Sequence, residues 1–435
     1  MTFLPWLFLL VAAGAVLTLP RRLAAIPVLA AACYVPSNVG LELASFSLPI
    51  YRVVLGFGLL RAAIRRETLV GGLNSIDRCM VAWSAWVLFA SFFHLWEPGS
   101  GPKYASGYVM NIALSYFLIR AWCRGWEDAK RLIKALAVLL VPVALGMTME
   151  HMIHRNYFSA FGAPEGVYVR DGAIRSQGPF AHPILAGTVG SVCVVYMLAI
   201  WEEHRLLAII GIASALSMVF ASNSSGPLVS LIFAVGAVMA WRFRAWTRAF
   251  RYCAVFTYLV LEIVMSRPAY YVISMFDLTG SSTGWHRSRL IEAAIEHLPD
   301  WWLFGTDWTF NWMSAVSYSE RHSDITNYYI SIGVVAGLPA MFLTILMIWR
   351  SFRWVGTLVQ GDDASKAQER FGAWCLGAGL FSHALSSLSV AYFDQSVVFF
   401  WMNISLISTL YSSAISQNIP TEAPRHIIAP SRPAV

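Results

Sequence analysis

Apolar runs long enough to cross a lipid bilayer recur along the whole chain and constrain its fold more than any other feature. A transmembrane helix needs about 20 predominantly apolar residues. Thirteen stretches approach or meet this length: 3–19, 23–39, 45–60, 79–95, 107–122, 132–149, 184–201, 206–221, 226–241, 251–266, 325–349, 371–390 and 396–414. Their continuous apolar character excludes the alternating strands of an outer-membrane barrel. We therefore predict an all-α polytopic integral membrane protein with about 12–13 transmembrane helices.

The composition agrees with a protein whose main solvent is lipid. Only 13% of the 435 residues are charged and 57% are hydrophobic, whereas a soluble globular protein carries about 25% charged residues. We expect a single polytopic membrane domain over residues 1–415. The segment 416–435 contains four prolines and is expected to be a disordered cytoplasmic tail.

The distribution of Lys and Arg predicts the orientation, because cytoplasmic loops carry an excess of these residues. With the N-terminus outside, 22 of the 31 Lys and Arg residues fall on the cytoplasmic side and 8 on the outer side. Arg52 lies within a predicted span and completes the total. The same bias accounts for the net charge of +7, and no basic stripe with interleaved aromatic residues suggests nucleic acid as a partner.

Metal and disulfide chemistry have weak support in the sequence. The six cysteines lie in or at the ends of apolar stretches without a C-x-x-C pair, which is typical of core residues. Glu150-His151-x-x-His154 has helical spacing, but no third ligand accompanies it. We expect no metal and no cofactor.

Two connections are long, and both fall on the outer side: 150–183 and 267–324. Long loops in a compact protein are usually functional. They carry seven of the eight outer basic residues, and the planar guanidinium group is well matched to phosphate. Within the second loop, apolar residues at spacings of three and four predict an amphipathic helix over 287–298, stopped by Pro299.

Arginines in both loops stand in local sequences that favour anion binding. Arg175 precedes Gln177 and the Gly178-Pro179 turn signal, and would be held rigidly at the membrane surface. His182 precedes the next span, where a role as a helix cap is favoured over a catalytic one.

Arg287 and Arg289 open the amphipathic helix, whose N-terminus attracts anions. Because the two arginines are two residues apart, one faces the site and the other the surface. Arg289 is the favoured one.

His322, Asp324 and Asn327 precede the span that starts near residue 325. A neutral His can take a proton from a hydroxyl, and Asp324 could orient it or act as the base itself. The alternative is structural, with Asp324 or Thr326 capping the helix and His322 on the loop surface. Both readings stay open, and the catalytic one is favoured because two arginine sites lie on the same side.

These residues resemble motifs of the bacterial O-antigen ligase and O-antigen polymerase superfamily. Three features carry the resemblance: the turn Arg175-Ser-Gln-Gly-Pro-Phe-Ala-His-Pro-Ile-Leu-Ala-Gly, the late outer loop with Arg287, Arg289 and Trp301-Trp-Leu-Phe-Gly, and His322-Ser-Asp-Ile-Thr-Asn-Tyr-Tyr-Ile followed by Gly337-Leu. They span about 60 residues of the chain. Many relatives carry an adjacent His-Asn pair where this chain has Thr326-Asn327.

The resemblance implies a GT-C-like, metal-independent glycosyltransferase in the bacterial inner membrane. Its donor would be an undecaprenyl-diphosphate-linked oligosaccharide on the periplasmic face, and its acceptor a glycan or lipid hydroxyl. Arg175 and Arg289, with Arg287 nearby, would hold the diphosphate, while His322 or Asp324 would activate the acceptor, supported by Gln177, His182 and Asn327. A chain-length regulator and a flippase are the implied protein partners, besides membrane lipid.

Three functions are weighed against one another. Polymerisation of surface-polysaccharide repeat units is favoured, and ligation to lipid A core or another acceptor is the alternative within the same reaction class. A transporter of polysaccharide or lipid intermediates is a third. The predicted spans hold few ionisable residues (Arg52, Glu262 and His383), and no internal repeat is visible, which argues against a transporter.

Overall fold

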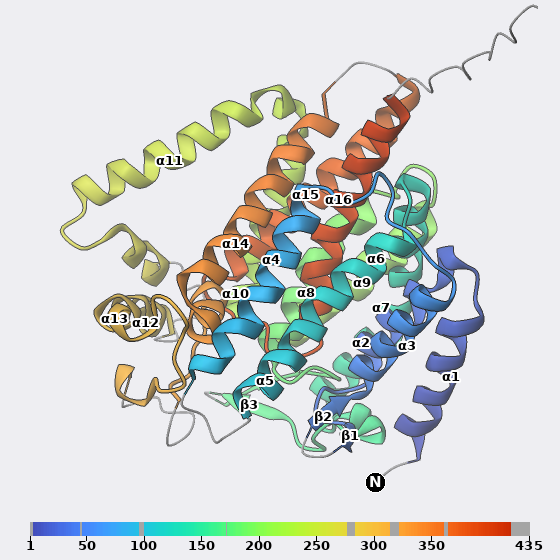
Figure 1. The fold of residues 1–435 in the computed structure, drawn as a ribbon, viewed down its shortest axis with the longest axis horizontal. Coiled ribbons are helices and arrows are strands. Elements are labelled where there is room, and N and C mark those ends of the chain that lie inside the picture. Colours follow the sequence, from blue (N-terminus) through green and yellow to red (C-terminus); the bar gives the residue numbers. More distant parts are fainter. Residues whose placement is uncertain are drawn as a thin grey trace, which may run out of the picture.

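The computed structural model describes residues 3–43, 46–94, 100–170, 172–275, 283–313, 322–360 and 364–418, and these residues form a bundle of helices (Figure 1). Its long helices are α1 (Leu4–Thr18), α2 (Ala25–Tyr34), α3 (Ile50–Ile64), α4 (Ser75–Ala90), α5 (Ser100–Val109), α6 (Ser115–Trp122), α7 (Trp126–Ile153), α8 (Pro183–Leu198), α9 (Arg205–Ala221), α10 (Ser225–Met239), α11 (Thr247–Val264), α12 (Thr283–Glu296), α14 (Tyr328–Leu358), α15 (Ala367–Ser386) and α16 (Val397–Asn418).

Each of the thirteen apolar stretches overlaps one of these helices. Within the described residues, five helical segments are long and apolar enough to cross a membrane: 75–93, 126–153, 225–264, 328–358 and 397–417. Three shorter apolar helices, α1, α8 and α9, accompany them. The largely helical structure, with helices that could span a membrane, is compatible with the predicted all-α membrane protein, and the number of 12–13 spans stays a prediction.

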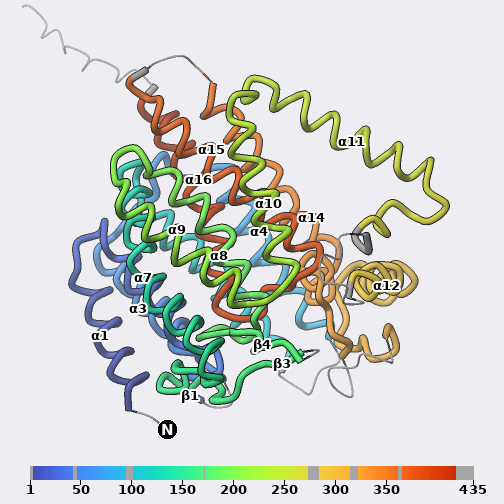
Figure 2. The backbone as a smooth tube through the Cα atoms, turned by 180° about the vertical axis from the view of Figure 1, so that it is seen from behind, coloured from blue at the N-terminus to red at the C-terminus, as the bar shows by residue number. Residues whose placement is uncertain are grey.

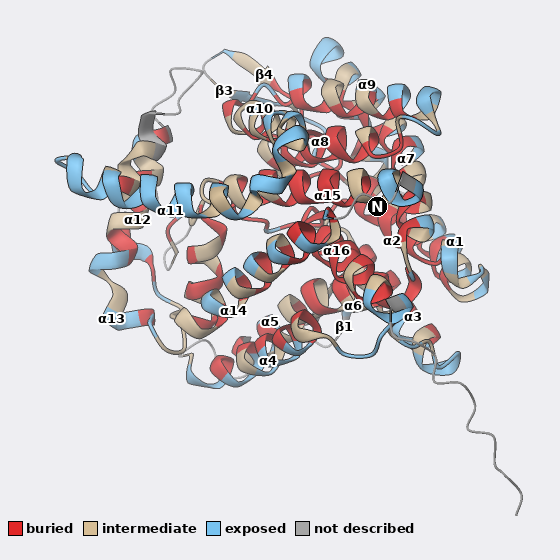
Figure 3. Cartoon of the chain, turned by 90° about the horizontal axis from the view of Figure 1, so that it is seen from above, coloured by how far each residue is buried: buried red, intermediate tan, exposed pale blue. Residues whose placement is uncertain are grey.

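Helix α16 forms the centre of the bundle. Its residues from Val398 to Leu410 are buried without interruption, and it packs against α6, α14 and α15. Seen along the bundle, buried residues gather around α15 and α16, while the outward surfaces of α1 and α11 are exposed (Figure 3). A helix that is buried on all sides needs partners for its polar side chains, and α16 carries several serines.

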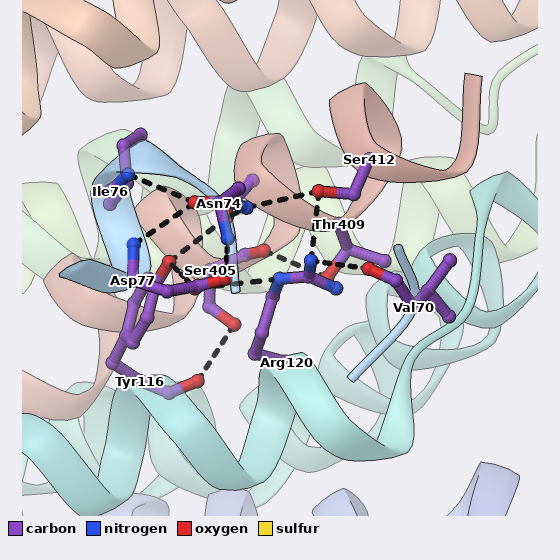
Figure 4. Close-up of polar contacts among 10 residues, drawn as sticks. Val70, Asn74, Ile76, Asp77, Tyr116, Arg120, Ser405, Thr409 and Ser412 are labelled. Atoms are coloured by element: carbon purple, nitrogen blue, oxygen red, sulfur yellow. Dashed lines mark hydrogen bonds and ion pairs between the residues drawn. The ribbon is translucent and has the colours of Figure 1, made fainter. Parts of the chain in front are cut away.

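A buried polar cluster connects α16 to two other helices (Figure 4). Arg120 of α6 and Asp77 of α4 form an ion pair at 3.6 Å, with both side chains fully buried. The Tyr116 hydroxyl donates to Asp77 at 2.5 Å, and Arg120 donates to the Ser412 hydroxyl of α16 at 2.8 Å. Asn74 begins α4 as part of a capping box with Asp77. The cluster therefore fixes three helices at one level of the bundle.

The opposite end of the bundle, called the loop face below, carries two β-hairpins and the short outer helices (Figures 1 and 2). Strands β1 (Gly40–Leu43) and β2 (Phe46–Pro49) pair antiparallel, as do β3 (Tyr168–Arg170) and β4 (Ala173–Arg175). Helix α12 and the one-turn helix α13 (Leu298–Trp301) lie at the same end.

The amphipathic helix of the late loop begins and ends earlier than predicted. It was expected over 287–298 with Pro299 as its stop, but α12 spans Thr283–Glu296. Pro299 instead lies in the first turn of α13, where its missing N–H group costs nothing. His297 forms the junction between the two helices.

The segment that follows α13 packs against a break in α14. Ala336 and Gly337 leave the helical conformation, and Gly337 has φ of +76°. The Leu338 N–H donates to the Trp302 carbonyl at 2.8 Å, and the Thr306 N–H donates to the Val334 carbonyl at 2.8 Å. Backbone groups freed by the break are thus paired with the 302–306 segment, which attaches the outer helices to α14.

Helix α11 stands apart from the bundle in both Figure 1 and Figure 2. None of its residues is buried. Its first turns touch α14, where the Arg251 guanidinium lies 5.6 Å from the centre of the Trp349 ring. Its far end leads through the 3-10 segment Ala269–Met275 towards α12.

Candidate functional site

The turn at 175–183 is held from three sides. Both oxygens of the buried Glu150 carboxylate accept backbone N–H groups, from Gln177 at 3.0 Å and from Gly178 at 2.8 Å. The Asn156 side chain donates to the Gly178 carbonyl at 2.8 Å. Gly178 has φ of +58°, which favours glycine at this position. The rigid turn expected around Arg175 is present.

The connection between α15 and α16 supplies the third side of this turn. The buried Asp394 carboxylate accepts the Ala181 N–H at 2.9 Å, and the Gln395 amide donates to the Pro179 carbonyl at 2.7 Å. Burial raises the pKa of Asp394, and its hydrogen bonds oppose that rise. These contacts join segments that are more than 200 residues apart in the chain.

The buried side chain of Arg175 reaches the N-terminus of α10. Its Nη2 donates to the Ser224 hydroxyl at 2.5 Å, and its guanidinium lies 5.4 Å from the centre of the Tyr168 ring. Ser224 is the N-cap residue of α10, but its side chain accepts no hydrogen bond from the first turn of that helix. Ser224 instead donates to the Ser222 carbonyl at 2.8 Å. The Ser224 side chain therefore does not cap the first N–H groups of α10.

Arg287 of α12 approaches the same helix end. Its Nη2 lies 3.9 Å from the point that a β-carbon on Gly226 would occupy. Gly226 is in the first turn of α10, two residues after Ser224. Two guanidinium groups from different loops therefore each approach the N-terminus of α10, where the helix dipole adds further positive potential.

Arg289, the arginine favoured from the sequence, does not share this arrangement. Its Nη1 forms an ion pair with Glu292 on the same helix and lies 3.8 Å from Glu296. Glu292 also accepts the Tyr271 hydroxyl at 2.8 Å. The Arg289 side chain is thus engaged with carboxylates one and two turns further along α12.

His182 is the N-cap of α8. Its Nδ1 accepts the Ile184 N–H at 3.2 Å, and its ring packs edge-on against Tyr168. Burial and the positive charges of Arg175 and Arg170 lower its pKa to about 4. A neutral imidazole therefore caps the helix, in line with the structural role favoured from the sequence.

The residues ahead of α14 have distinct surroundings. Asn327 is the N-cap of α14, accepting the Tyr329 and Ile330 N–H groups, and its amide donates to the Leu388 carbonyl at 3.1 Å. The cap is therefore neither Asp324 nor Thr326, the two residues considered for it. His322 is half-buried, and Ser323 is tied to Thr309. Asp324 is exposed, yet neighbouring protein removes part of its water and raises its pKa.

Several residues that build the site were missed from the sequence. Glu150 was considered only as part of a metal pattern, and its actual contacts are with the turn. The Ser224-Ser225-Gly226 start of α10 and the Asp394-Gln395 pair follow apolar stretches on the predicted outer side. Their positions at span boundaries were the available signal.

The chain matches no protein-family model and no curated protein.

Proposed function

We propose that the protein is a glycosyltransferase of the GT-C type that takes a glycan from undecaprenyl diphosphate and transfers it to an acceptor hydroxyl. Polymerisation of surface-polysaccharide repeat units is the favoured reaction, with ligation to lipid A core or another acceptor as the alternative. The protein would reside in the bacterial inner membrane, with its loop face in the periplasm and its C-terminus in the cytoplasm.

The approach of Arg175 and Arg287 to the N-terminus of α10 is the observation that carries this proposal. A diphosphate leaving group gains negative charge as the glycosidic bond breaks. Fixed positive groups that lie where charge develops stabilise the transition state more than the ground state. Guanidinium groups also match the geometry of phosphate oxygens.

The acceptor hydroxyl must lose a proton during the transfer. His322 and Asp324 are the proposed candidates for this task, because both precede α14 at the loop face and the raised pKa of Asp324 makes its carboxylate a stronger base. Asn327 would contribute indirectly, since it caps α14 and ties this segment to Leu388.

Transfer by the purified, membrane-reconstituted protein tests the proposal, with a lipid-linked oligosaccharide as donor. We expect Arg175→Ala and Arg287→Ala to lower kcat by about 100-fold or more, the cost of removing one group that stabilises a developing anion. Arg289→Ala is the matched control, because it removes the same charge from the same helix. We expect its kcat to stay within about threefold of the parent value, because its guanidinium is paired with Glu292 and Glu296.

Two results would count against the proposal: full activity in both Arg175→Ala and Arg287→Ala, or no transfer by the parent protein with any lipid-linked donor. The products separate the two reactions. A ladder of lengthened glycans supports polymerisation, while a single product on an added acceptor supports ligation.

A further inference from the structure

Arg52 occupies an electrostatically unfavourable position in the fold. It is the third residue of α3, where the helix N-terminus is already positive. It also lies within the predicted span 45–60, near its loop-face end, where a charged side chain is costly. No ion pair of Arg52 occurs among the described residues.

The guanidinium of Arg52 is nevertheless fixed in place. Its Nε donates to the Asn111 amide oxygen at 2.9 Å, and its Nη1 donates to the Ser47 carbonyl at 2.7 Å. It also lies against Gly107, where a β-carbon would come within 2.7 Å of Nη1. The glycine thus leaves room for the guanidinium beside α5.

Asn111, which binds the Arg52 guanidinium, lies in a π-helical turn. Residues Met110–Leu114 form the turn between α5 and α6. Such turns are rare and occur frequently at functional sites. The chain therefore accepts a less regular helix in the segment that holds Arg52.

An exposed aromatic surface lies beside Arg52. Tyr104 of α5 is 48% exposed, and its ring stacks on that of Tyr108 with centroids 6.1 Å apart and planes 10° apart. Tyr104 also interacts electrostatically with Arg52. A partly exposed ring beside a fixed cation offers an apolar surface next to a positive charge.

The charges near Arg52 leave room for an anionic ligand. Lys103 is exposed next to Tyr104, and Glu42 is exposed on β1 opposite Ser47. Asp394 interacts electrostatically with Tyr51, the neighbour of Arg52, but its oxygens are engaged with the backbone of Ala181 and Ser396. The cation is thus held mainly by neutral groups: the Asn111 amide, the Ser47 carbonyl and the Tyr51 hydroxyl.

We propose that Arg52 and Tyr104 form a second binding site on the loop face, for a carboxylate-bearing sugar of the acceptor glycan. The sugar ring would pack on Tyr104, and its carboxylate would pair with the Arg52 guanidinium. This inference rests on the proposed function only in assigning the sugar to the acceptor.

Saccharide binding tests this site without the transfer reaction. The full-length protein in nanodiscs of zwitterionic phosphatidylcholine is titrated with a galacturonic acid trisaccharide and with the neutral galactose trisaccharide. We expect the acidic saccharide to bind more tightly, and Arg52→Gln and Tyr104→Ala each to weaken its binding by about tenfold or more. Arg155→Gln, which alters an exposed arginine of the loop face, should leave binding unchanged.

Equal binding of the acidic saccharide by Arg52→Gln and the parent protein would overturn the site, as would equal affinity for the neutral saccharide. Tyr104 is exposed, so Tyr104→Ala tests the site even where Arg52→Gln disturbs folding. The proposal is also wrong if the site holds lipid head groups. The result that would show this is loss of saccharide binding in anionic phosphatidylglycerol, together with a crosslink of that lipid to residue 104 that forms only when Arg52 is present. No lipid-linked donor is added in this experiment. A failure to bind the saccharide therefore does not contradict the transfer reaction, and a failure of transfer does not contradict saccharide binding at this site.

Discussion

At the scale of single residues, His182 performs a task that a protonated imidazole cannot perform. Its Nδ1 accepts a backbone N–H at the start of α8, which requires a free lone pair. Arg175 and Arg170 lie close enough to oppose a positive charge on the ring. The cap therefore depends on the ring remaining neutral. Protonation of the ring at low pH removes this hydrogen bond from the first turn of α8.

We expect the stability of the protein to fall as the pH decreases from about 6.5 to about 4. The pKa of His182 is about 4 in the folded protein against 6.5 for a free histidine, so the unfolded chain binds the proton first. The stabilisation is fully present above pH 6.5 and is lost through that window. Thermal unfolding of the purified protein at pH 7 and pH 5 measures the effect.

His182→Asn is the control for this prediction, because Asn caps helices well and does not titrate. We expect this variant to lose less stability between pH 7 and pH 5 than the parent. An identical loss in both proteins would assign the pH dependence to other groups.

At the scale of elements, helix positions could be predicted and their partners could not. Continuous apolar runs set the positions of the helices because lipid imposes their length. By contrast, the Ala181–Asp394 contact joins residues 213 positions apart, and no local pattern encodes such a pairing. The ion pair between Arg289 and Glu292 bears on the choice between Arg287 and Arg289, and which of the two holds a diphosphate stays a prediction.

The junction between the α14 break and the 302–306 segment explains two motifs that were noted separately in the sequence. Trp302-Leu-Phe-Gly305 and Gly337-Leu338 contact each other through backbone groups. A β-carbon on Gly337 would lie 1.9 Å from the Leu303 carbonyl oxygen, and one on Gly305 would lie 2.3 Å from the Val334 carbonyl oxygen. Glycine is therefore required on both sides of this junction.

Gly337→Ala should destabilise the protein by about 2 kcal/mol or more, because it combines backbone strain with a steric clash. We also expect it to detach the outer helices, increasing proteolysis between residues 283 and 313. Gly356→Ala on the same helix is the control. Its β-carbon would lie at an ordinary 3.6 Å from Thr247, so its thermal midpoint should match or exceed that of the parent. Equal stability of both variants would contradict the importance of the junction.

At the scale of the whole molecule, the cluster around Arg120 binds distant parts of the chain into one body. Asp77, Arg120 and Ser412 come from the first quarter, the second quarter and the end of the sequence. The ion pair is fully buried, so removing one partner leaves an uncompensated charge.

Asp77→Asn should cost about 3–5 kcal/mol of stability, and the double variant Asp77→Asn/Arg120→Met should recover part of this loss. A double-mutant cycle on thermal or denaturant unfolding measures the coupling. Arg131→Met, which breaks a partly exposed ion pair with Asp128, should cost about 1 kcal/mol or less. Additive effects of the Asp77 and Arg120 changes would show that the pair contributes no coupling.

The orientation of the molecule has a direct test in thiol labelling. In a variant lacking the native cysteines, Gly166→Cys lies at an exposed position of the loop face, and Gln360→Cys lies at an exposed position beyond the end of α14. We expect a membrane-impermeant maleimide to label residue 166 in cells with a permeabilised outer membrane, and residue 360 only after lysis. The reverse pattern would place the loop face in the cytoplasm.

The exposure of helix α11 extends the scaffold of this protein beyond the polypeptide itself. None of its side chains is buried, and it links the bundle to the segment that leads into α12 and Arg287. In a membrane, lipid rather than protein would surround such a helix, and its tilt would follow the thickness of the hydrocarbon layer. The height at which Arg287 meets the loop face would then be set partly by the bilayer itself, which becomes a structural component of the site.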